Sequence, residues 1–289
     1  MTIAHGVHVI PAAEYHADPC VAPSLSASIA TILMQSSPLH AKTAHPRLTE
    51  NPVKEEARHL DLGQLCHSLM LEGADIAVVI EADNYRTKAA QEARDSARLA
   101  GKCPLLAHEM VEVNHMMMAC RAQLTAHQTA GEAFTSAGKP EQTLIWQEPN
   151  GIWCRCRIDW LHASKPWIVD YKTGKRSAHP QSISRVAAAS GWCIQDAFYR
   201  RGFKAVFGHD LEPEFFFVCQ ENFPPFALSV VETSPADLAL AEAQVEYAIA
   251  TWGECLKSGR WPGYATTVQR ITSPSYVEAS WLEREQEEV

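Results

Sequence analysis

The sequence has 289 residues, of which 46% are hydrophobic and 20% are charged, and its formal net charge is −9 at pH 7. This composition predicts a soluble chain with one large domain, or one domain with an attached helical part. The absence of any run of about 18 apolar residues excludes a typical transmembrane helix. The acidic net charge is a mild argument against a nucleic-acid partner, because phosphate binding usually requires a basic surface.

The N-terminal part is predicted to be mainly helical. Residues 1–23 are rich in Pro and His and are expected to be extended. A helix is predicted over Ser24–Gln35, because serines suited to N-capping open it and a Ser-Pro pair follows it. A second helix is predicted over Lys54–Leu71, ending near the next glycine. Thr87–Ala130 is expected to form two helices, broken around Gly101–Pro104.

The central part of the chain changes from helical spacing to the alternation of β-strands. Strands are predicted over Thr143–Gln147 and Ile152–Leu161, joined by a turn at residues 148–151. A third strand is predicted over Trp167–Lys172, and Gly174 ends it.

Helical character returns after this sheet segment. A helix is predicted over Gln181–Phe203, followed by strands over Glu214–Cys219 and Phe226–Val231 and a final helix over Pro235–Lys257. The element order predicts an α/β fold behind a helical N-terminal part.

Acidic residues stand near the ends of two neighbouring predicted strands. Side chains alternate along Ile152–Leu161, so Arg157 and Asp159 share one face of it. Asp170 and Lys172 are two residues apart on the next strand and therefore also share a face. Two acids and a lysine can thus converge on one point.

Such a group suits a hard divalent cation. Mg²⁺ binds carboxylate oxygens and can bridge to the oxygens of a phosphate substrate. A lysine beside it can orient or help to deprotonate the attacking water and can stabilise developing negative charge. The alternative is that Asp170 begins a turn and that Lys172 is an ordinary surface residue, because Asp-x-Lys is a common triplet. The apolar strand before Asp170 and the Arg-Ile-Asp strand end favour the metal site.

One segment departs from the acidic average. Between Lys165 and Lys204 eight residues are basic, and only Asp170 and Asp196 are acidic. A basic segment inside an acidic chain can form a phosphate-binding face, although ordinary solvated charge explains it about equally well.

The cysteines and the N-terminal residues predict a cytoplasmic location. The nine cysteines are odd in number and include no Cys-x-x-Cys pair, which favours reduced thiols in the cytoplasm. The first residues do not have the basic-then-apolar pattern of a secretory signal.

Several ordered motifs resemble those of one nuclease family. Arg157–Asp159, Ile168–Gly174 and Gln195–Tyr199 are together similar to the RecB-like branch of the PD-(D/E)XK nucleases, and Gly63–His67 resembles its helical Gly-x-x-x-His motif. Segments further upstream resemble the nuclease domain of RecE (exonuclease VIII) and its phage relatives, namely Gly6–His8, Tyr15–His16, Ser24–Ser26, Ser37–Lys42 and His67–Glu72. Each motif is weak by itself, whereas the ordered set is specific.

The resemblance implies a fold and a division of the chain. The fold would be the restriction-endonuclease-like PD-(D/E)XK core, a central mixed sheet flanked by helices. We expect a helical part at 1–135 carrying the Gly-x-x-x-His helix, a nuclease core at 136–265, and an acidic tail at 266–289.

The resemblance also implies a metal site. Asp159 and Asp170 would bind Mg²⁺ or Mn²⁺ together with the backbone carbonyl of Tyr171, and Lys172 would be the catalytic lysine. His67, on a helix packed over the site, would complete the metal environment. A histidine satisfied inside a helical core is the alternative for His67.

Further roles follow for neighbouring positions. Gln195 and Tyr199 share one helix face and would touch the catalytic lysine or the scissile phosphate, the alternative being a plain polar face. Glu141 matches a commonly acidic position and is a further candidate metal ligand. The candidates for DNA binding are basic residues of the central segment and its preceding strand: Arg157, Lys175, Arg176, Arg185, Arg200 and Arg201. Some RecB-like nucleases hold an iron–sulfur cluster, but no close cysteine triplet occurs here, so none is expected.

The implied activity is an exonuclease that resects linear duplex DNA from the 5′ end to leave 3′ single-stranded overhangs. Relatives form rings around DNA and work with a single-strand annealing protein of the RecT type, so we expect a ring-shaped homo-oligomer and such a partner. The setting would be the cytoplasm of a bacterial cell, in phage or prophage recombination.

Three other functions are compatible with the sequence. The same fold could act on single-stranded or flap DNA, or it could be a non-catalytic DNA-binding or assembly module. A metal hydrolase for a small phosphoester is a third alternative, which the basic central segment makes less attractive.

Overall fold

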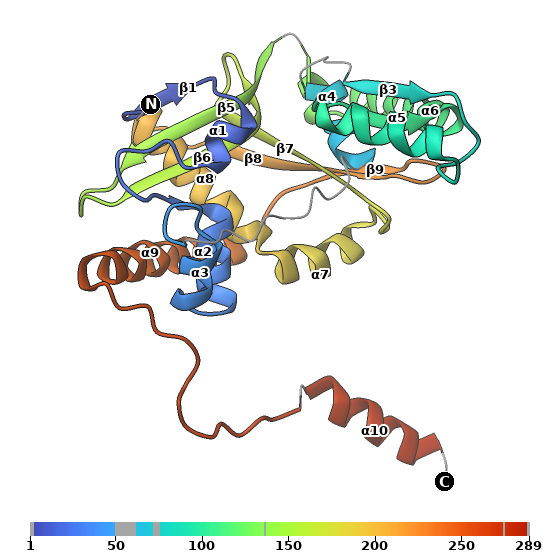
Figure 1. The fold of residues 1–289 in the computed structure, drawn as a ribbon. Helices are drawn as coiled ribbons and strands as arrows, with labels where there is room; N and C mark the ends of the chain where they lie inside the picture. The colour runs from blue at the N-terminus through green and yellow to red at the C-terminus, as the bar shows by residue number, and fades with distance from the viewer. Residues whose placement is uncertain (1–2, 50–61, 72–75, 136, 274, 288–289) are drawn as a thin grey trace.

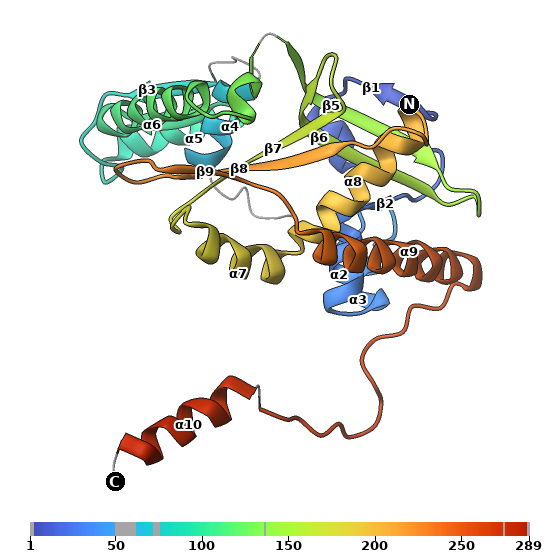
Figure 2. The same cartoon turned by 180° about the vertical axis from the view of Figure 1, so that it is seen from behind.

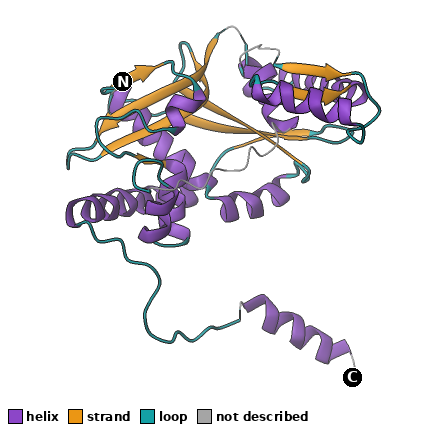
Figure 3. Ribbon diagram, viewed as in Figure 1, coloured by secondary structure: helices purple, strands orange, loops and turns teal. Residues whose placement is uncertain are grey.

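The computed structural model describes residues 3–49, 62–71, 76–135, 137–273 and 275–287. Among these residues, no helix is both long and apolar enough to cross a membrane. Figure 1 shows a twisted sheet with helices on its faces, and Figure 3 shows how strands and helices divide the chain.

The central sheet is mixed and mostly antiparallel. The strands β5 (Gly138–Gln147), β6 (Trp153–His162) and β7 (Trp167–Gly174) follow one another as antiparallel neighbours. Next to them, β8 (Glu214–Glu221) runs parallel to β7, and β9 (Leu228–Val231) is antiparallel to β8. This arrangement confirms the predicted α/β class with a mixed sheet flanked by helices.

The N-terminal segment takes part in this sheet. The strand β1 (Gly6–His8) pairs with β5, and β2 (Leu25–Ser26) pairs with β6. Between them lies the short helix α1 (Ala12–His16). The prediction that residues 1–23 are extended missed the pairing of β1 and the helix α1, and β2 lies where the helix over Ser24–Gln35 was predicted to begin. Strands of two or three residues are too short to show an alternation. The division at residue 135 stays a proposal, and residues before it supply two strands of the core sheet.

Two helices follow β2 and cover the sheet. The predicted helix Ser24–Gln35 is α2 (Ala27–Gln35), and the Ser26 hydroxyl accepts a hydrogen bond from the Ile29 N–H at its start. The helix α3 (Pro38–Ala44) comes next.

A second group of elements lies at the other end of the sheet (Figure 1). It comprises α4 (Leu62–Leu71), β3 (Ala77–Ile80), α5 (Lys88–Leu99), β4 (Cys103–Leu106), α6 (Ala107–Thr125) and a 3-10 turn at Ala130–Glu132. The predicted break between two helices therefore contains the strand β4, which pairs in parallel with β3. The predicted start of the α4 helix at Lys54 and its end near Gly73 lie outside the described residues.

The predicted helix Gln181–Phe203 consists of two helices. These are α7 (Pro180–Ser190) and α8 (Trp192–Phe207), with Gly191 between them at φ 70°. An added Cβ at Gly191 would lie 2.4 Å from Thr31 Cγ2 on α2, so glycine permits both the left-handed turn and the close approach. The prediction of one continuous helix was wrong here, and the turn sets the direction of α8.

Two further helices complete the chain. The helix α9 (Pro235–Ser258) packs beside α8, as Figure 2 shows from behind. The acidic tail predicted at 266–289 contains α10 (Ser275–Glu287), which stands away from the body at the end of an extended segment (Figure 1).

The sheet separates two apolar cores. One core joins α2, α8 and α9 to the sheet through residues such as Cys156, Ile158 and Ile168. The other joins α4 and α6 to it, and contains Trp160, Val169 and Tyr171. Side chains were predicted to alternate along this strand, but Ile158 and Trp160, which are two residues apart, lie in different cores, so the alternation along β6 is interrupted at Asp159.

A buried ionic network fastens the N-terminal segment to β6. Asp18 Oδ1 lies 3.1 Å from Arg155 Nη1, and Asp18 Oδ2 lies 3.2 Å from His45 Nε2. The N–H of Ser24 also donates to Asp18 Oδ2 at 2.9 Å. Burial opposes the charged form of Asp18, but His45, Arg155 and Ser24 outweigh it and lower the pKa of Asp18 from 3.8 to about 2.

This pKa predicts an acid-sensitive contribution to stability. Because the folded-state pKa of Asp18 lies below its unfolded value, its contribution is fully present above about pH 4 and is lost as the pH falls towards 2, amounting to about 2 kcal/mol. In Asp18→Asn the free energy of unfolding should fall by about 3–5 kcal/mol at neutral pH, because Arg155 loses a buried partner.

Urea unfolding of both proteins from about pH 7 to about pH 3 measures this contribution. Asp18→Asn should lose less stability than the natural sequence between about pH 4 and about pH 3. The exposed Asp210 offers the control Asp210→Asn. Equal acid sensitivity in the natural sequence and Asp18→Asn would contradict the prediction.

Candidate metal centre and active site

Three carboxylates from three neighbouring strands lie near one another. Glu141 is on β5, Asp159 is on β6 and Asp170 is on β7. The register of β5 and β6 pairs Gln142 with Ile158 and Pro140 with Trp160, which places Glu141 opposite Asp159. Glu141 has a positive φ of 55°, an unusual conformation for a residue with a side chain.

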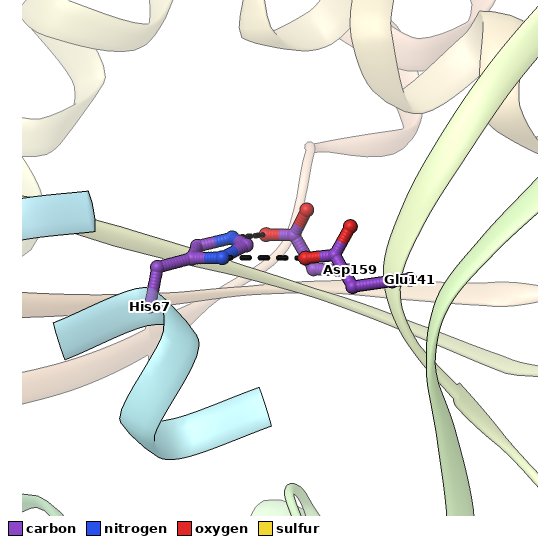
Figure 4. A group of neighbouring side chains, drawn as sticks. All are labelled: His67, Glu141 and Asp159. Atoms are coloured by element: carbon purple, nitrogen blue, oxygen red, sulfur yellow. Dashed lines mark ion pairs between the residues drawn. The ribbon is translucent and has the colours of Figure 1, made fainter. Parts of the chain in front are cut away.

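His67 of α4 joins two of these carboxylates (Figure 4). Its Nε2 lies 2.9 Å from Asp159 Oδ2, and its Nδ1 lies 3.4 Å from Glu141 Oε1. Burial lowers the pKa of His67, but Asp159, Glu141 and Asp170 outweigh burial and raise it. A carboxylate at each ring nitrogen stabilises the protonated imidazole, and a cation bound by His67 would take the place of a ring proton.

Asp159 is held as a carboxylate by its surroundings. Its Oδ2 also accepts the backbone N–H of Tyr171 at 2.9 Å. Burial would raise the pKa of Asp159, but the charges of His67 and Lys172 and these hydrogen bonds lower it. An ionised carboxylate in a confined site is the form that binds a cation.

Asp170 is held by a lysine and an amide. Lys172 Nζ lies 2.6 Å from Asp170 Oδ1, and Gln195 Nε2 donates to Asp170 Oδ2 at 2.5 Å. Lys172 Nζ also donates to Gln195 Oε1 at 3.1 Å. Burial and the charge of Asp159 raise the pKa of Asp170 despite Lys172. Burial lowers the pKa of Lys172, but Asp170 and Asp159 raise it overall, so the ammonium form is favoured.

These contacts define a cluster that fits a divalent cation. One ligand atom each from His67, Glu141 and Asp159 lies within 4.8 Å of the others. Carboxylate oxygens with an imidazole nitrogen are ligands that Mg²⁺, Mn²⁺ and related ions accept. Asp170 is not in this three-residue group, although the sequence predicts it as a metal ligand. Its metal role, like that of the Tyr171 carbonyl, stays a prediction.

A hollow of about 620 Å³ opens onto the cluster, and we call it the first hollow. His67, Glu141, Asp159 and Lys172 line it. It is also lined by residues for which the sequence alone predicts no site role, namely Ala12, Tyr15, His16, Ser68, Ile76 and Thr173. Three of these come from α1, which β1 and β2 bring over the sheet. The resemblance at Tyr15–His16 drew attention to this segment in the sequence, but it did not indicate that the segment lies beside the metal-ligand candidates.

The remaining predicted site residues differ in their surroundings. Tyr199 is buried, lines the first hollow, and packs edge to face on Phe215. Arg157 forms an ion pair with Glu141 at the same hollow. The side chain of Tyr171 points into the second apolar core and donates to Gln220 Oε1 at 2.5 Å.

The basic residues predicted to bind DNA fall into two groups. Arg200 pairs with Asp196, and Arg201 Nη2 lies 2.7 Å from Glu148 Oε2, so these two guanidinium groups bind acids of the same chain. Lys175, Arg176 and Arg185 are exposed at the end of β7 and on α7. DNA binding by any of them stays a prediction.

Gln195 forms hydrogen bonds with both Lys172 and Asp170, so removing its side chain should lower the catalytic activity. In Gln195→Ala, Lys172 and Asp170 keep their ion pair but lose the amide that sets their orientation. The rate of DNA cleavage should fall about 10- to 100-fold, as for other residues that orient catalytic groups. Steady-state kinetics on linear duplex check this. The exposed Gln181 provides the control Gln181→Ala, and equal rates in both variants would remove Gln195 from the site.

Comparisons with known proteins give the family and the fold of this chain. The model of a family described as a PDDEXK-like domain of unknown function (DUF3799) matches residues 29–274. A candidate exonuclease from Eubacterium rectale is similar in structure, with a TM-score of 0.54 and 12% identity over 87% of this chain and 90% of that chain. This likeness shows the fold. Among the curated proteins, no sequence matches this chain.

Two further solved structures are similar over a smaller part of the chain. A phage-related exonuclease from Haemophilus somnus 129PT has a TM-score of 0.30 and 14% identity over 68% of this chain and 95% of that chain. An alkaline exonuclease from Laribacter hongkongensis has a TM-score of 0.26 and 14% identity over 66% of this chain and 96% of that chain. The family match covers most of the sequence and confirms the predicted PD-(D/E)XK resemblance. The chain therefore belongs to the DUF3799 family of PDDEXK-like domains.

Proposed function

We propose that this protein is a divalent-metal-dependent exodeoxyribonuclease that hydrolyses the phosphodiester bonds of linear duplex DNA. One observation carries the proposal. The cluster of His67, Glu141 and Asp159 lies at the same hollow as Lys172, whose ammonium group contacts Asp170. A cation-binding group beside a partly buried lysine is an arrangement that suits hydrolysis of a phosphodiester.

The residues that would hold the metal are Asp159, Glu141 and His67, with Asp170 and the Tyr171 carbonyl as further candidates. When bound, Mg²⁺ or Mn²⁺ supplies positive charge against the negative charge that develops on the phosphate.

Lys172 contributes a positive charge of its own. Because its pKa is raised, the ammonium form prevails near neutral pH. Its ammonium group can therefore donate hydrogen bonds to a phosphate oxygen or to the attacking water, whereas removal of a proton from that water falls to another group. Gln195 keeps the ammonium beside Asp170.

The finer features of the activity are supported by the motif resemblance. They are resection from the 5′ end to give 3′ overhangs, a preference for Mg²⁺, a ring-shaped homo-oligomer, and a single-strand annealing partner of the RecT type. The resemblance to the RecE-type branch likewise supports action in recombination, in a phage or prophage inside the bacterial cytoplasm.

End-labelled linear duplex DNA tests the proposal directly. With Mg²⁺, label at the 5′ end should be released first as mononucleotide, and a closed circle should stay intact. EDTA should stop the reaction, since the acids alone supply no positive charge to the phosphate. Faster digestion of single-stranded or flap DNA would instead support that alternative substrate. Intact linear duplex at every protein and metal concentration would show that the proposed activity is wrong.

A further inference from the structure

A second hollow also has Lys172 in its lining. Its volume is about 350 Å³, and it is formed by the end of β7, the start of α8 and one face of α7. The residues that matter for its chemistry are Lys172, Lys175, Arg176, Ile183, Val186 and Trp192. In Figure 1 the helix α7 lies below the end of β7.

The two hollows meet at the proposed catalytic lysine. Lys172 and Thr173 line both of them. Lys172 Nζ lies 5.6 Å from the centre of a ring of Trp192 and 2.6 Å from Asp170 Oδ1. A ligand that reaches Lys172 from the first hollow can therefore continue into the second.

The charge of the second hollow differs from that of the first. Lys175 and Arg176 follow β7 directly and are exposed, whereas none of the described residues that line this hollow is acidic. The first hollow contains Glu141 and Asp159. The second hollow is therefore suited to an anion, and the first to a cation.

Trp192 gives the second hollow a flat apolar wall. Its side chain is half-buried, and its ring stacks on Phe217 with centroids 5.2 Å apart and an interplanar angle of 25°. This stacking holds the indole plane in place, and Ile183 and Val186 of α7 add apolar surface. A rigid aromatic face next to positive charge suits a nucleotide, because a base stacks on the ring while a phosphate meets the cations.

We propose that the second hollow binds one nucleotide of the DNA strand being cut, next to the scissile phosphate. Its base lies against Trp192, and the adjoining phosphate contacts Lys175 and Arg176. The inference rests on the proposed nuclease function and adds the residues that position the strand. Trp192, Lys175 and Arg176 are positioning residues, since the groups proposed to react lie in the first hollow.

Removal of single bases from the substrate tests the role of Trp192. A series of duplexes, each with one abasic site at a different position near the cut, is digested by the natural sequence, by Trp192→Leu and by Trp192→Phe. For the natural sequence, an abasic site at one particular position should lower kcat/KM by roughly 5- to 150-fold, which is the effect of losing one base–aromatic stack. Trp192→Leu should show a lower kcat/KM on intact DNA and no sensitivity at that position. Trp192→Phe keeps a ring and should keep the sensitivity.

The comparison of base removal with ring removal separates stacking from a folding defect. A merely misfolded variant would cut every substrate more slowly, yet still respond to the abasic site. Thermal unfolding of each variant identifies any loss of stability from the broken Trp192–Phe217 contact. The same abasic sensitivity in Trp192→Leu and the natural sequence, or no sensitive position in either, would overturn the proposal.

The cations are tested by salt dependence. In the double variant Lys175→Ala/Arg176→Ala, the slope of log affinity against log salt concentration should become shallower by roughly 0.7 to 0.9 for each lost phosphate contact. The double variant Lys102→Ala/Lys257→Ala removes the same charge from exposed positions outside both hollows and should leave the slope unchanged. Equal slopes in the two double variants would contradict a phosphate contact at Lys175 and Arg176.

A binding measurement distinguishes this inference from the proposed function. The anisotropy of a labelled oligonucleotide, in the presence of EDTA, reports affinity without cleavage. If the natural protein binds DNA and Trp192→Leu binds it less tightly, the hollow holds a strand even if no cutting is ever seen. If the protein cuts DNA, but neither its DNA affinity nor its response to abasic sites changes in Trp192→Leu, the proposed nuclease function is supported and this inference is wrong. A third outcome would also contradict the proposal: no abasic position changes kcat/KM, yet free mononucleotide inhibits the natural protein and not Trp192→Leu. The hollow would then bind the released product.

Discussion

Replacing Lys172 by alanine is expected to lower kcat/KM for cleavage of linear duplex by roughly 10³-fold, while the protein stays folded. The variant removes the ammonium group that lies 2.6 Å from Asp170 and faces the first hollow. In the proposed mechanism this positive charge stabilises the negative charge that develops on the phosphate during hydrolysis. Asp170 keeps its hydrogen bond from Gln195 and, because burial already raises its pKa, it can take up a proton rather than remain as an unpaired buried charge.

Two measurements are needed for Lys172→Ala. Single-turnover cleavage gives the loss in rate, and thermal unfolding shows whether the fold persists. The exposed Lys257 on α9 supplies the control Lys257→Ala, which removes the same charge at a distance and should cut normally. A fully active Lys172→Ala would exclude a catalytic lysine, and an unfolded one would indicate a structural role for the ion pair.

Replacing Asp159 by asparagine is expected to abolish both metal binding and cleavage. Asparagine has the same shape, and its oxygen can still accept the Tyr171 N–H that Asp159 accepts. It lacks the negative charge that faces His67 and that a cation requires. Metal affinity should fall by at least about 100-fold, because even residues that only orient metal ligands contribute up to that factor.

Binding can be followed through stability. A divalent cation that binds only the folded state raises the midpoint of thermal unfolding, by an amount that grows with the logarithm of its concentration relative to its Kd. The natural sequence should therefore unfold at a higher temperature as Mg²⁺ or Mn²⁺ is added, whereas Asp159→Asn should not respond. Asp210→Asn, at an exposed position, should behave like the natural sequence. A normal metal response in Asp159→Asn would remove Asp159 from the metal centre.

The longer elements of the sheet were predicted well from the sequence. The strand expected at Ile152–Leu161 is β6 at Trp153–His162, and the last helix expected at Pro235–Lys257 is α9 at Pro235–Ser258. These segments show a clear period over many residues, which is a local property of the chain. The short strands β1 to β4 were missed, because two to four residues carry little periodicity and their pairing depends on other segments; β9, which also has four residues, was predicted because it lies in a longer apolar run.

The site was predicted unevenly for a similar reason. Asp170 and Lys172 lie on one strand two residues apart, so alternation alone placed them together. The contacts that join His67 to Glu141 and Asp159 connect three elements far apart in the sequence. Only the motif resemblance drew attention to His67 and Glu141. It also implied that Gln195 touches the catalytic lysine, and the Gln195 amide contacts both Lys172 and Asp170.

The sequence by itself determined the α/β class, the central strands, and the local pair of an acid and a lysine on β7. Through its ordered motifs it also determined the resemblance to the PD-(D/E)XK nucleases. The class, the strands and the pair follow from the spacing of residues within single elements, which is a local property of the chain, whereas the resemblance follows from the order of motifs along it.

The tertiary structure decided which distant groups meet. The register of β5 against β6 placed Glu141 opposite Asp159, and the turn at Gly191 directed Gln195 toward Asp170 and Lys172. The tertiary structure also placed Trp192 near Lys172, and both residues line the second hollow. Strand register and helix direction depend on packing between segments far apart in the chain, and the spacing within one segment does not encode them.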